Sequence, residues 1–198
     1  GVSIRYGKRI VCSGVTFSIQ QGDRIALCGA NGTGKSSVLK LLCGERIEHG
    51  GTLLLGSQLK ISYVPQDASF LRGTLSDYAA QYEIDESLFK AILRKLDFAR
   101  VQFEKDMADF SAGQKKKVLL ARSLCEQAHL HIWDEPLNYI DVFSRIQIEN
   151  LLLDFRPTIL FVEHDRVFCE KIATKTVALS RLDTARSGLY NEAEMEAF

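Results

Sequence analysis

Short apolar segments recur along the chain and predict strands that alternate with helices. The segments with strand character are 15–19, 24–28, 52–55, 60–64, 130–134, 158–162 and 175–179. Helices are predicted at 36–43, 111–124 and 143–153, with a further one starting at Asp165. Strands that alternate with helices form a largely parallel sheet covered on both faces. We therefore expect an α/β fold, in which 52–55 and 60–64 form a pair of strands.

Residues 67–110 interrupt this alternation, because their periodicity is helical. Asp85 can cap a helix whose apolar side chains share one face, namely Leu88, Phe89, Ile92, Leu93 and Leu96. We expect one domain over residues 1–180, with a helical subdomain at about 67–124. The polar segment 181–198 shows no periodicity and remains unassigned.

The composition is that of a folded protein without a membrane span. The chain has 198 residues, 25 Lys+Arg against 25 Asp+Glu, and 46% hydrophobic residues, which excludes a disordered chain and offers no net charge for coating DNA. No apolar run approaches the roughly 18 residues needed to cross a bilayer, and we expect no signal peptide. The five cysteines include no CxxC pair, so we expect reduced core thiols. We expect a cytoplasmic protein, and Gly1 in place of Met suggests a piece of a longer chain.

A complete phosphate-binding motif lies between a predicted strand and a predicted helix. Residues 29–36 read GANGTGKS and match GxxxxGK[ST]. Glycines allow backbone N–H groups to surround phosphate oxygens, Lys35 can reach the β- and γ-phosphates, and the Ser36 hydroxyl can bind Mg²⁺. With glycine at about 7% of residues, such a match arises by chance in about one of a hundred chains of this length. The expected phosphate-binding residues are Gly29, Asn31, Gly32, Thr33, Gly34, Lys35, Ser36 and Ser37.

This motif occurs in kinases, GTPases and ATPases, so further residues must identify the chemistry. No guanine-reading NKxD segment is present, which disfavours a GTPase. The strand 130–134 ends in Asp134, which can hold Mg²⁺ through water, and Glu135 can act as general base on an attacking water. The alternative is a solvated acidic pair. His164 follows the next apolar strand, where it is either structural or a contact of the γ-phosphate.

Residues 109–114 (DFSAGQ) resemble the LSGGQ signature of ATP-binding-cassette (ABC) proteins, and the resemblance covers about residues 2–180. It implies a P-loop NTPase of ABC type, with a mostly parallel core sheet, an antiparallel β subdomain and an inserted helical subdomain. Phe110 and Ala112 depart from the family pattern, and we expect a modest effect. The resemblance also implies ATP and Mg²⁺ as cofactors, adenine stacking by Tyr6, and sensing of Mg²⁺ and water by Gln66.

The same resemblance gives roles to two further parts of the chain. His164 is similar to the family's switch histidine, and 136–141 to its D-loop. Ser111 and Gly113 are expected to contact the γ-phosphate held by a second cassette, because Ser111 can cap the next helix and direct its N–H groups at an anion. The partner is therefore a second cassette, in the same longer chain or in a homodimer.

Segment 135–141 (EPLNYID) is similar to the EPxNxxD form of ABC-F proteins, and 58–66 and 140–164 look like the second cassette of ABC-F antibiotic-resistance proteins. These have two cassettes, no membrane domain, and act on the ribosome and its RNA. The resemblance implies an ATPase in translation or antibiotic resistance. A transporter's nucleotide-binding subunit is the alternative. A DNA-repair cassette is disfavoured, because 67–110 is too short for a coiled coil. The lysines at 115–117 are either a solvated helix face or a phosphate-contacting edge.

Overall fold

The computed structural model describes residues 1–179, so the unassigned segment 181–198 and the last residue of the predicted domain lie outside its described part. Parallel strands form the central sheet in the spatial order β5-β6-β7-β3-β8. They are β3 (Arg24–Cys28), β5 (Ile61–Val64), β6 (Leu130–Asp134), β7 (Ile159–Val162) and β8 (Lys175–Ala178). A smaller antiparallel sheet has the order β2-β1-β4 and consists of β1 (Val2–Tyr6), β2 (Arg9–Val15) and β4 (His49–Gly50). The predicted α/β fold is confirmed.

Helices cover both faces of the parallel sheet. They are α1 (Lys35–Leu42), α2 (Leu75–Gln81), α3 (Glu86–Lys95), α4 (Ala112–Cys125), α5 (Val142–Phe155) and α6 (Arg166–Ile172). One face packs on α1 and the antiparallel sheet, through an apolar cluster that includes Leu27 and Ile132. The other face packs on α4, α5 and α6, through a cluster that includes Trp133 and Phe161. Because successive strand residues point to opposite faces, strands buried on both faces are apolar along their whole length.

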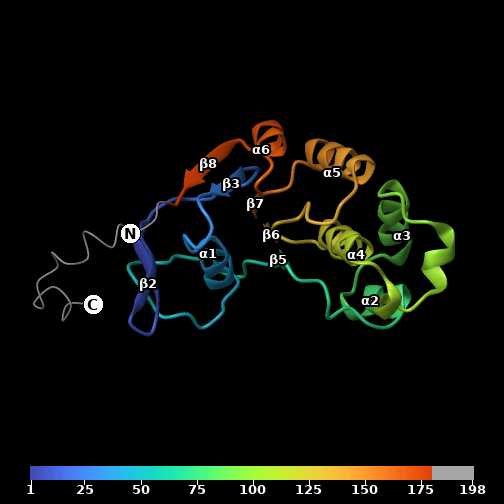
Figure 1. Cartoon of the computed structure of the whole chain (residues 1–198), viewed down its shortest axis with the longest axis horizontal. Helices are drawn as coiled ribbons and strands as arrows, with labels where there is room; N and C mark the ends of the chain where they lie inside the picture. The colour runs from blue at the N-terminus through green and yellow to red at the C-terminus, as the bar shows by residue number, and fades with distance from the viewer. Residues whose placement is uncertain (180–198) are drawn as a thin grey trace, which may run out of the picture.

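The molecule is elongated, with the parallel sheet between two unlike ends (Figure 1). The antiparallel sheet lies at one end with the N-terminus, and α2 and α3 lie at the other, beyond α4 (Figure 1). The predicted cap of α3 is confirmed, because the Asp85 carboxylate accepts a hydrogen bond from Leu88 N at 2.6 Å. Two 3₁₀ helices, Arg100–Glu104 and Met107–Asp109, connect α3 to α4. No helix within residues 1–179 has the length and apolar character that a bilayer crossing requires.

Two predicted strands are wrong. Segments 15–19 and 52–55 contain almost no strand structure, because β2 ends at Val15 and the small sheet pairs β1 with His49–Gly50 instead. The partner of β5 is β6 in the parallel sheet, not 52–55. An apolar pattern reports that side chains are buried, but it does not identify the strand that supplies the hydrogen bonds. Leu54 is 88% exposed, so its hydrophobicity is a poor guide even to burial.

Smaller corrections concern single side chains. Leu88 is 44% exposed although the other four apolar residues predicted for that helix face are buried. The cysteines are free thiols as predicted, but among them only Cys12 is fully buried in the described structure. Partial burial raises the pKa of the Cys43 thiol to about 12, which keeps it protonated and unreactive at neutral pH.

Candidate functional site

Loops at one edge of the parallel sheet bring the predicted site residues together. The phosphate loop follows β3, Gln66 follows β5, Glu135 follows β6, and His164 follows β7. Since these strands are parallel, their carboxyl ends lie at the same edge, where open α/β sheets bind ligands. Residues that are distant in the sequence therefore meet at this edge.

The phosphate loop has a backbone that only glycine can provide at two positions. At Gly29 the φ angle is +150°, and a Cβ would lie 2.5 Å from Leu179 O. Gly34 caps α1 in a left-handed conformation with φ of 88°, and a Cβ there would lie 2.9 Å from Val11 Cγ1. The loop thus delivers its N–H groups and the N-terminus of α1 to the same region, as anion binding requires.

The side chains of the phosphate loop are held in place by the loop itself. Lys35 Nζ donates hydrogen bonds to Gly29 O at 2.8 Å and to Ala30 O at 3.1 Å. Thr33 is buried and its hydroxyl donates to Ala30 O at 2.9 Å, whereas Asn31 and Gly32 lie at the exposed tip. The ammonium group of Lys35 therefore lies over the loop, where a phosphate would compete for it with two carbonyl oxygens.

Tyr6 lies beside this loop, although the two are far apart in the sequence. The Tyr6 hydroxyl donates to Ser37 Oγ at 3.3 Å, and 51% of Tyr6 is exposed. Its ring is therefore available for stacking next to the first turn of α1. The contact brings Tyr6 and Ser37, both predicted to bind nucleotide, to the same place.

Asp134 and Ser36 fit a magnesium ion. Burial raises the pKa of the Asp134 carboxyl, and a hydrogen bond from the Ser36 side chain lowers it in part. Asp134 Oδ1 is buried and has no hydrogen-bond partner among the described residues. An unpartnered buried carboxylate oxygen is costly unless a cation or water binds it. The hydroxyl and the carboxylate are the oxygen ligands that Mg²⁺ prefers.

Glu135 is the point where three loops meet. Its Oε2 accepts hydrogen bonds from Gln66 Nε2 at 2.8 Å and from Asn138 Nδ2 at 2.6 Å. Its Oε1 lies 3.4 Å from His164 Nε2. The side chains of Gln66, Asn138 and His164 thus orient one carboxylate, which is what a general base needs. Asn138 belongs to the D-loop-like segment 136–141, and its contact with Glu135 was not predicted from the sequence.

Part of the predicted signature segment lines the same cavity as Ser36 and Asp134. The cavity measures about 670 Å³, and its lining includes Ser36, Asp134, Ala112 and Tyr139. Ser111 caps α4 as predicted: its hydroxyl accepts from Gln114 N at 3.2 Å, and the Gln114 side chain accepts from Ser111 N at 2.9 Å.

Gly113 has a packing role that the sequence did not reveal. A Cβ at Gly113 would lie 2.4 Å from Tyr139 O, so only glycine allows the start of α4 to approach segment 136–141 this closely. The backbone of the signature segment is therefore in direct contact with the loop that follows Glu135.

The lysines at 115–117 correct both sequence interpretations, because all three are buried. Lys116 Nζ donates to Pro65 O at 2.9 Å, to Gln66 O at 3.0 Å and to Asp134 O at 3.4 Å. Burial lowers the pKa of Lys116 to about 8, opposed by the nearby Asp134 carboxylate. Lys117 pairs with Asp141 at 2.7 Å. These lysines are neither a solvated face nor a free basic edge. Lys116 pairs with internal carbonyl groups and Lys117 with a carboxylate.

No sequence signal identified Lys116. α4 buries side chains around most of its circumference, so its polar residues do not fall on one exposed face. From the sequence alone, a run of lysines in such a helix is expected to be solvated. Only the structure shows the carbonyl groups that accept hydrogen bonds from Lys116.

The fold and this site define a P-loop ATPase domain. Residues 12–138 match the sequence model of the family described as "ABC transporter", and the chain belongs to that family. The chain is 34% identical over 188 residues to "ATP-binding protein Uup" of Caulobacter vibrioides, covering 90% of this chain and 31% of the relative. It is 29% identical over 185 residues to "Ribosome protection protein VmlR" of Bacillus subtilis, covering 90% and 33%. The chain thus spans about a third of the length of these relatives. The predicted ABC cassette with ABC-F-like features is confirmed.

A solved structure titled "Structure of ATP binding subunit of ABC transporter" has the same fold, with a TM-score of 0.71 at 22% identity, covering 99% of this chain and 98% of that one. A complex of archaeal ribosomal stalk protein aP1 and the archaeal ribosome recycling factor aABCE1 matches with a TM-score of 0.67 at 25% identity, covering 81% and 32%. These structures show the same fold. Because the chain belongs to the ABC family, it is expected to bind nucleotide.

Proposed function

We propose that this chain is a MgATP-binding and ATP-hydrolysing cassette of a cytoplasmic ABC-F protein that acts on the ribosome, in translation or in antibiotic resistance by target protection. The observation that carries the catalytic part is the convergence of Gln66, Asn138 and His164 on the Glu135 carboxylate. The similarity to a ribosome protection protein supports the ribosomal part.

In this proposal the loops around the site divide the binding and the chemistry between them. Tyr6 stacks on the adenine, the phosphate loop and Lys35 bind the phosphates, and Ser36, Asp134 and Gln66 hold the magnesium ion. The ion, when bound, neutralises charge that develops on the phosphate oxygens. Glu135 takes the proton of the attacking water, and Gln66 and His164 orient that water and the γ-phosphate.

The hydrolysis site is completed by a second cassette. Ser111 and Gly113 lie at the start of α4, where the N–H groups of Ala112 and Gly113 have no partner within the helix. In the proposed arrangement these groups bind the γ-phosphate held by the other cassette. The second cassette comes from the longer chain or from a second copy.

The nucleotide-binding subunit of a membrane transporter is the second candidate. It is favoured by the likeness of fold to a transporter's ATP-binding subunit over nearly the whole of both chains. The two candidates predict different partners for the ATP-bound protein, ribosomes in one case and a membrane permease in the other.

Sedimentation with ribosomes tests the proposal. The protein carrying this cassette, with Glu135→Gln to slow hydrolysis, is incubated with ribosomes and ATP or ADP and centrifuged through sucrose. We expect pelleting with ribosomes in ATP and several-fold less in ADP. The matched control Glu83→Gln, at an exposed site outside the candidate residues, should pellet less in ATP because it hydrolyses it. Absence of ribosome binding in both nucleotides would contradict the ribosomal role and favour the transporter candidate.

A further inference from the structure

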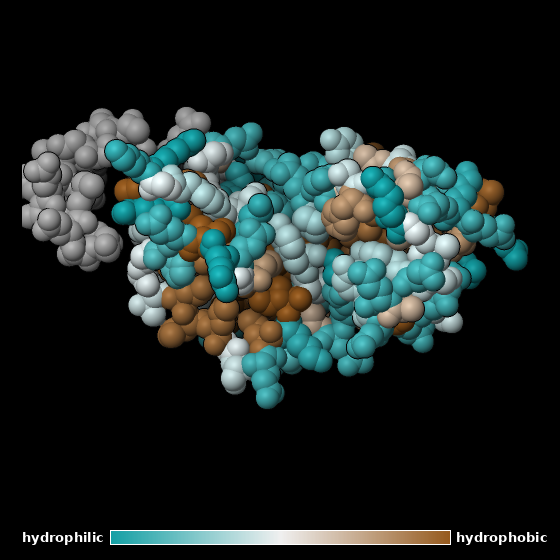
Figure 2. Space-filling model, turned by 90° about the horizontal axis from the view of Figure 1, so that it is seen from below, coloured by the Kyte–Doolittle hydropathy of each residue, from teal (hydrophilic) through white to brown (hydrophobic). Residues whose placement is uncertain are grey.

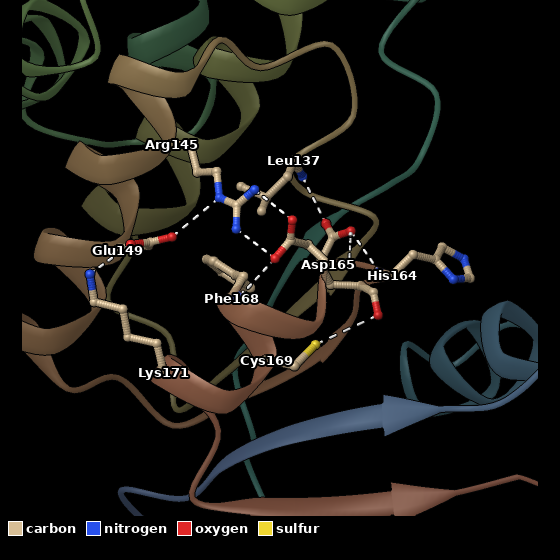
Figure 3. A network of polar contacts seen from close by, with 9 residues as sticks. Leu137, Arg145, Glu149, His164, Asp165, Phe168, Cys169 and Lys171 are labelled. Atoms are coloured by element: carbon tan, nitrogen blue, oxygen red, sulfur yellow. Dashed lines mark hydrogen bonds and ion pairs between the residues drawn. The ribbon is translucent and has the colours of Figure 1, made fainter.

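A carboxylate next to His164 ties two loops of the site together. The Glu163 side chain accepts hydrogen bonds from His164 N at 2.7 Å, from Asp165 N at 3.3 Å and from Leu137 N at 3.1 Å. The first two N–H groups belong to its own loop after β7, and the third belongs to segment 136–141 after β6. One half-buried carboxylate therefore links the two loops, and Figure 3 shows the Leu137 nitrogen directed into this network while the His164 ring projects away from it.

An ion pair joins the helices that follow the same two loops. Arg145, in the first turns of α5, donates to both carboxylate oxygens of Asp165, at 2.6 and 2.5 Å. Asp165 caps α6, since it also accepts from Phe168 N at 2.9 Å. Figure 3 shows the Arg145 fork facing Asp165. A bidentate pair of this kind fixes the relative orientation of the two side chains as well as the distance between them.

The linked loop 136–141 also touches the rest of the site. Asn138 donates to the Glu135 carboxylate at 2.6 Å, and Tyr139 O lies against Gly113. A displacement of this loop therefore reaches Glu135 through Asn138 and reaches His164 through Glu163. The start of α4 faces the same loop.

We propose that Glu163 is a positioning residue that couples segment 136–141 to His164, so that the imidazole contacts Glu135 and the γ-phosphate only when this segment is correctly placed. This inference rests on the proposed ATP hydrolysis and assigns its control to one carboxylate. A second cassette that presses on the exposed Tyr139 would move His164 through this link. In this role Glu163 acts through His164 and not on the nucleotide.

Glu163→Gln tests the coupling, because an amide NH₂ group cannot accept a hydrogen bond and at least one of the three N–H groups loses its acceptor. Glu170→Gln, on α6, is the matched control: it also removes one negative charge, from an exposed pair with Arg166. Rates are measured at the protein concentration that gives wild type its highest turnover. We expect kcat to fall about tenfold in Glu163→Gln with KM for ATP changed less than about twofold, and no change in Glu170→Gln.

The double variant separates positioning from general damage. If Glu163 acts through His164, Glu163→Gln should lower kcat no further in a His164→Ala background. An equal loss of kcat in both backgrounds, or equal rates in Glu163→Gln and Glu170→Gln, would overturn the inference. Should Glu163→Gln fail to fold, Glu163→Asp replaces it, because the shorter carboxylate keeps the charge but cannot span both loops. A wild type that binds ATP without hydrolysing it would overturn the proposed function itself, whereas the outcomes above leave that function intact.

Discussion

Glu135 adopts a left-handed backbone, with a φ angle of 47°, directly after the last residue of β6. Its N–H donates to Val162 O at 3.0 Å, so the neighbouring strand holds the residue in this conformation. A left-handed conformation at a residue other than glycine costs of order 1–3 kcal/mol and persists only where the surroundings enforce it. The strain turns the carboxylate toward Gln66 and His164.

Lys35 provides the first prediction at the residue scale. Replacing it with Ala removes charge-assisted hydrogen bonds worth about 1.5–3 kcal/mol to a phosphate, so we expect ATP to bind about ten- to a hundredfold more weakly. Trp133 is buried and precedes Asp134, so its fluorescence reports binding. Lys90→Ala, which breaks only an exposed pair with Glu86 on α3, is the control. Equal ATP affinity in wild type and Lys35→Ala would contradict the assignment.

Some contacts between site residues could be predicted from the sequence, and others could not. The nearness of Glu135 and His164 was expected from parallel strands that end at one edge, whereas Gln66 was expected only from the family resemblance; the structure brings all three together. The contacts of Lys116 and Glu163 are with backbone groups of loops. Such contacts depend on loop conformation, which hydrophobic patterns do not encode.

At the scale of elements, the predictions succeeded where both faces of a strand are buried. Segments 24–28 and 130–134 match β3 and β6 in both bounds, because a continuous apolar run bounded by polar residues has one interpretation in an α/β chain. The hairpin of β1 and β2 was missed, since its residues alternate between exposed and buried without a strong apolar run. Its turn depends on Gly7, with a φ angle of 59°.

The cap of α4 supplies a prediction that separates stability from activity. Ser111→Ala and Asp85→Ala each remove a side-chain cap, from α4 and α3 respectively, and each should lower the free energy of unfolding by about 0.5–2 kcal/mol. Only Ser111→Ala should also lower ATP turnover, because the start of α4 serves the second cassette. Denaturant unfolding and steady-state hydrolysis measure the two effects. Equal turnover in the two variants would limit Ser111 to a structural role.

At the scale of the whole molecule, the parallel sheet whose edge carries the site lies between the antiparallel sheet and the helices α2 and α3 (Figure 1). The face seen in Figure 2 carries an apolar area on one side of the molecule and a mostly polar surface over the other.

One chain holds one phosphate loop and one signature segment, and it spans about a third of the length of its relatives. We therefore propose that a complete hydrolysis site needs a second cassette.

The dependence of ATP turnover on protein concentration tests this account most directly. Turnover per chain is measured for wild type and Glu135→Gln from nanomolar to micromolar protein, with the second cassette added in a parallel series. We expect wild-type turnover per chain to rise with concentration or on adding the second cassette. Glu135→Gln should be slower by about 10²–10⁴-fold throughout while still binding ATP. A high turnover that stays constant on dilution to nanomolar protein, or near wild-type hydrolysis by Glu135→Gln, would contradict the account.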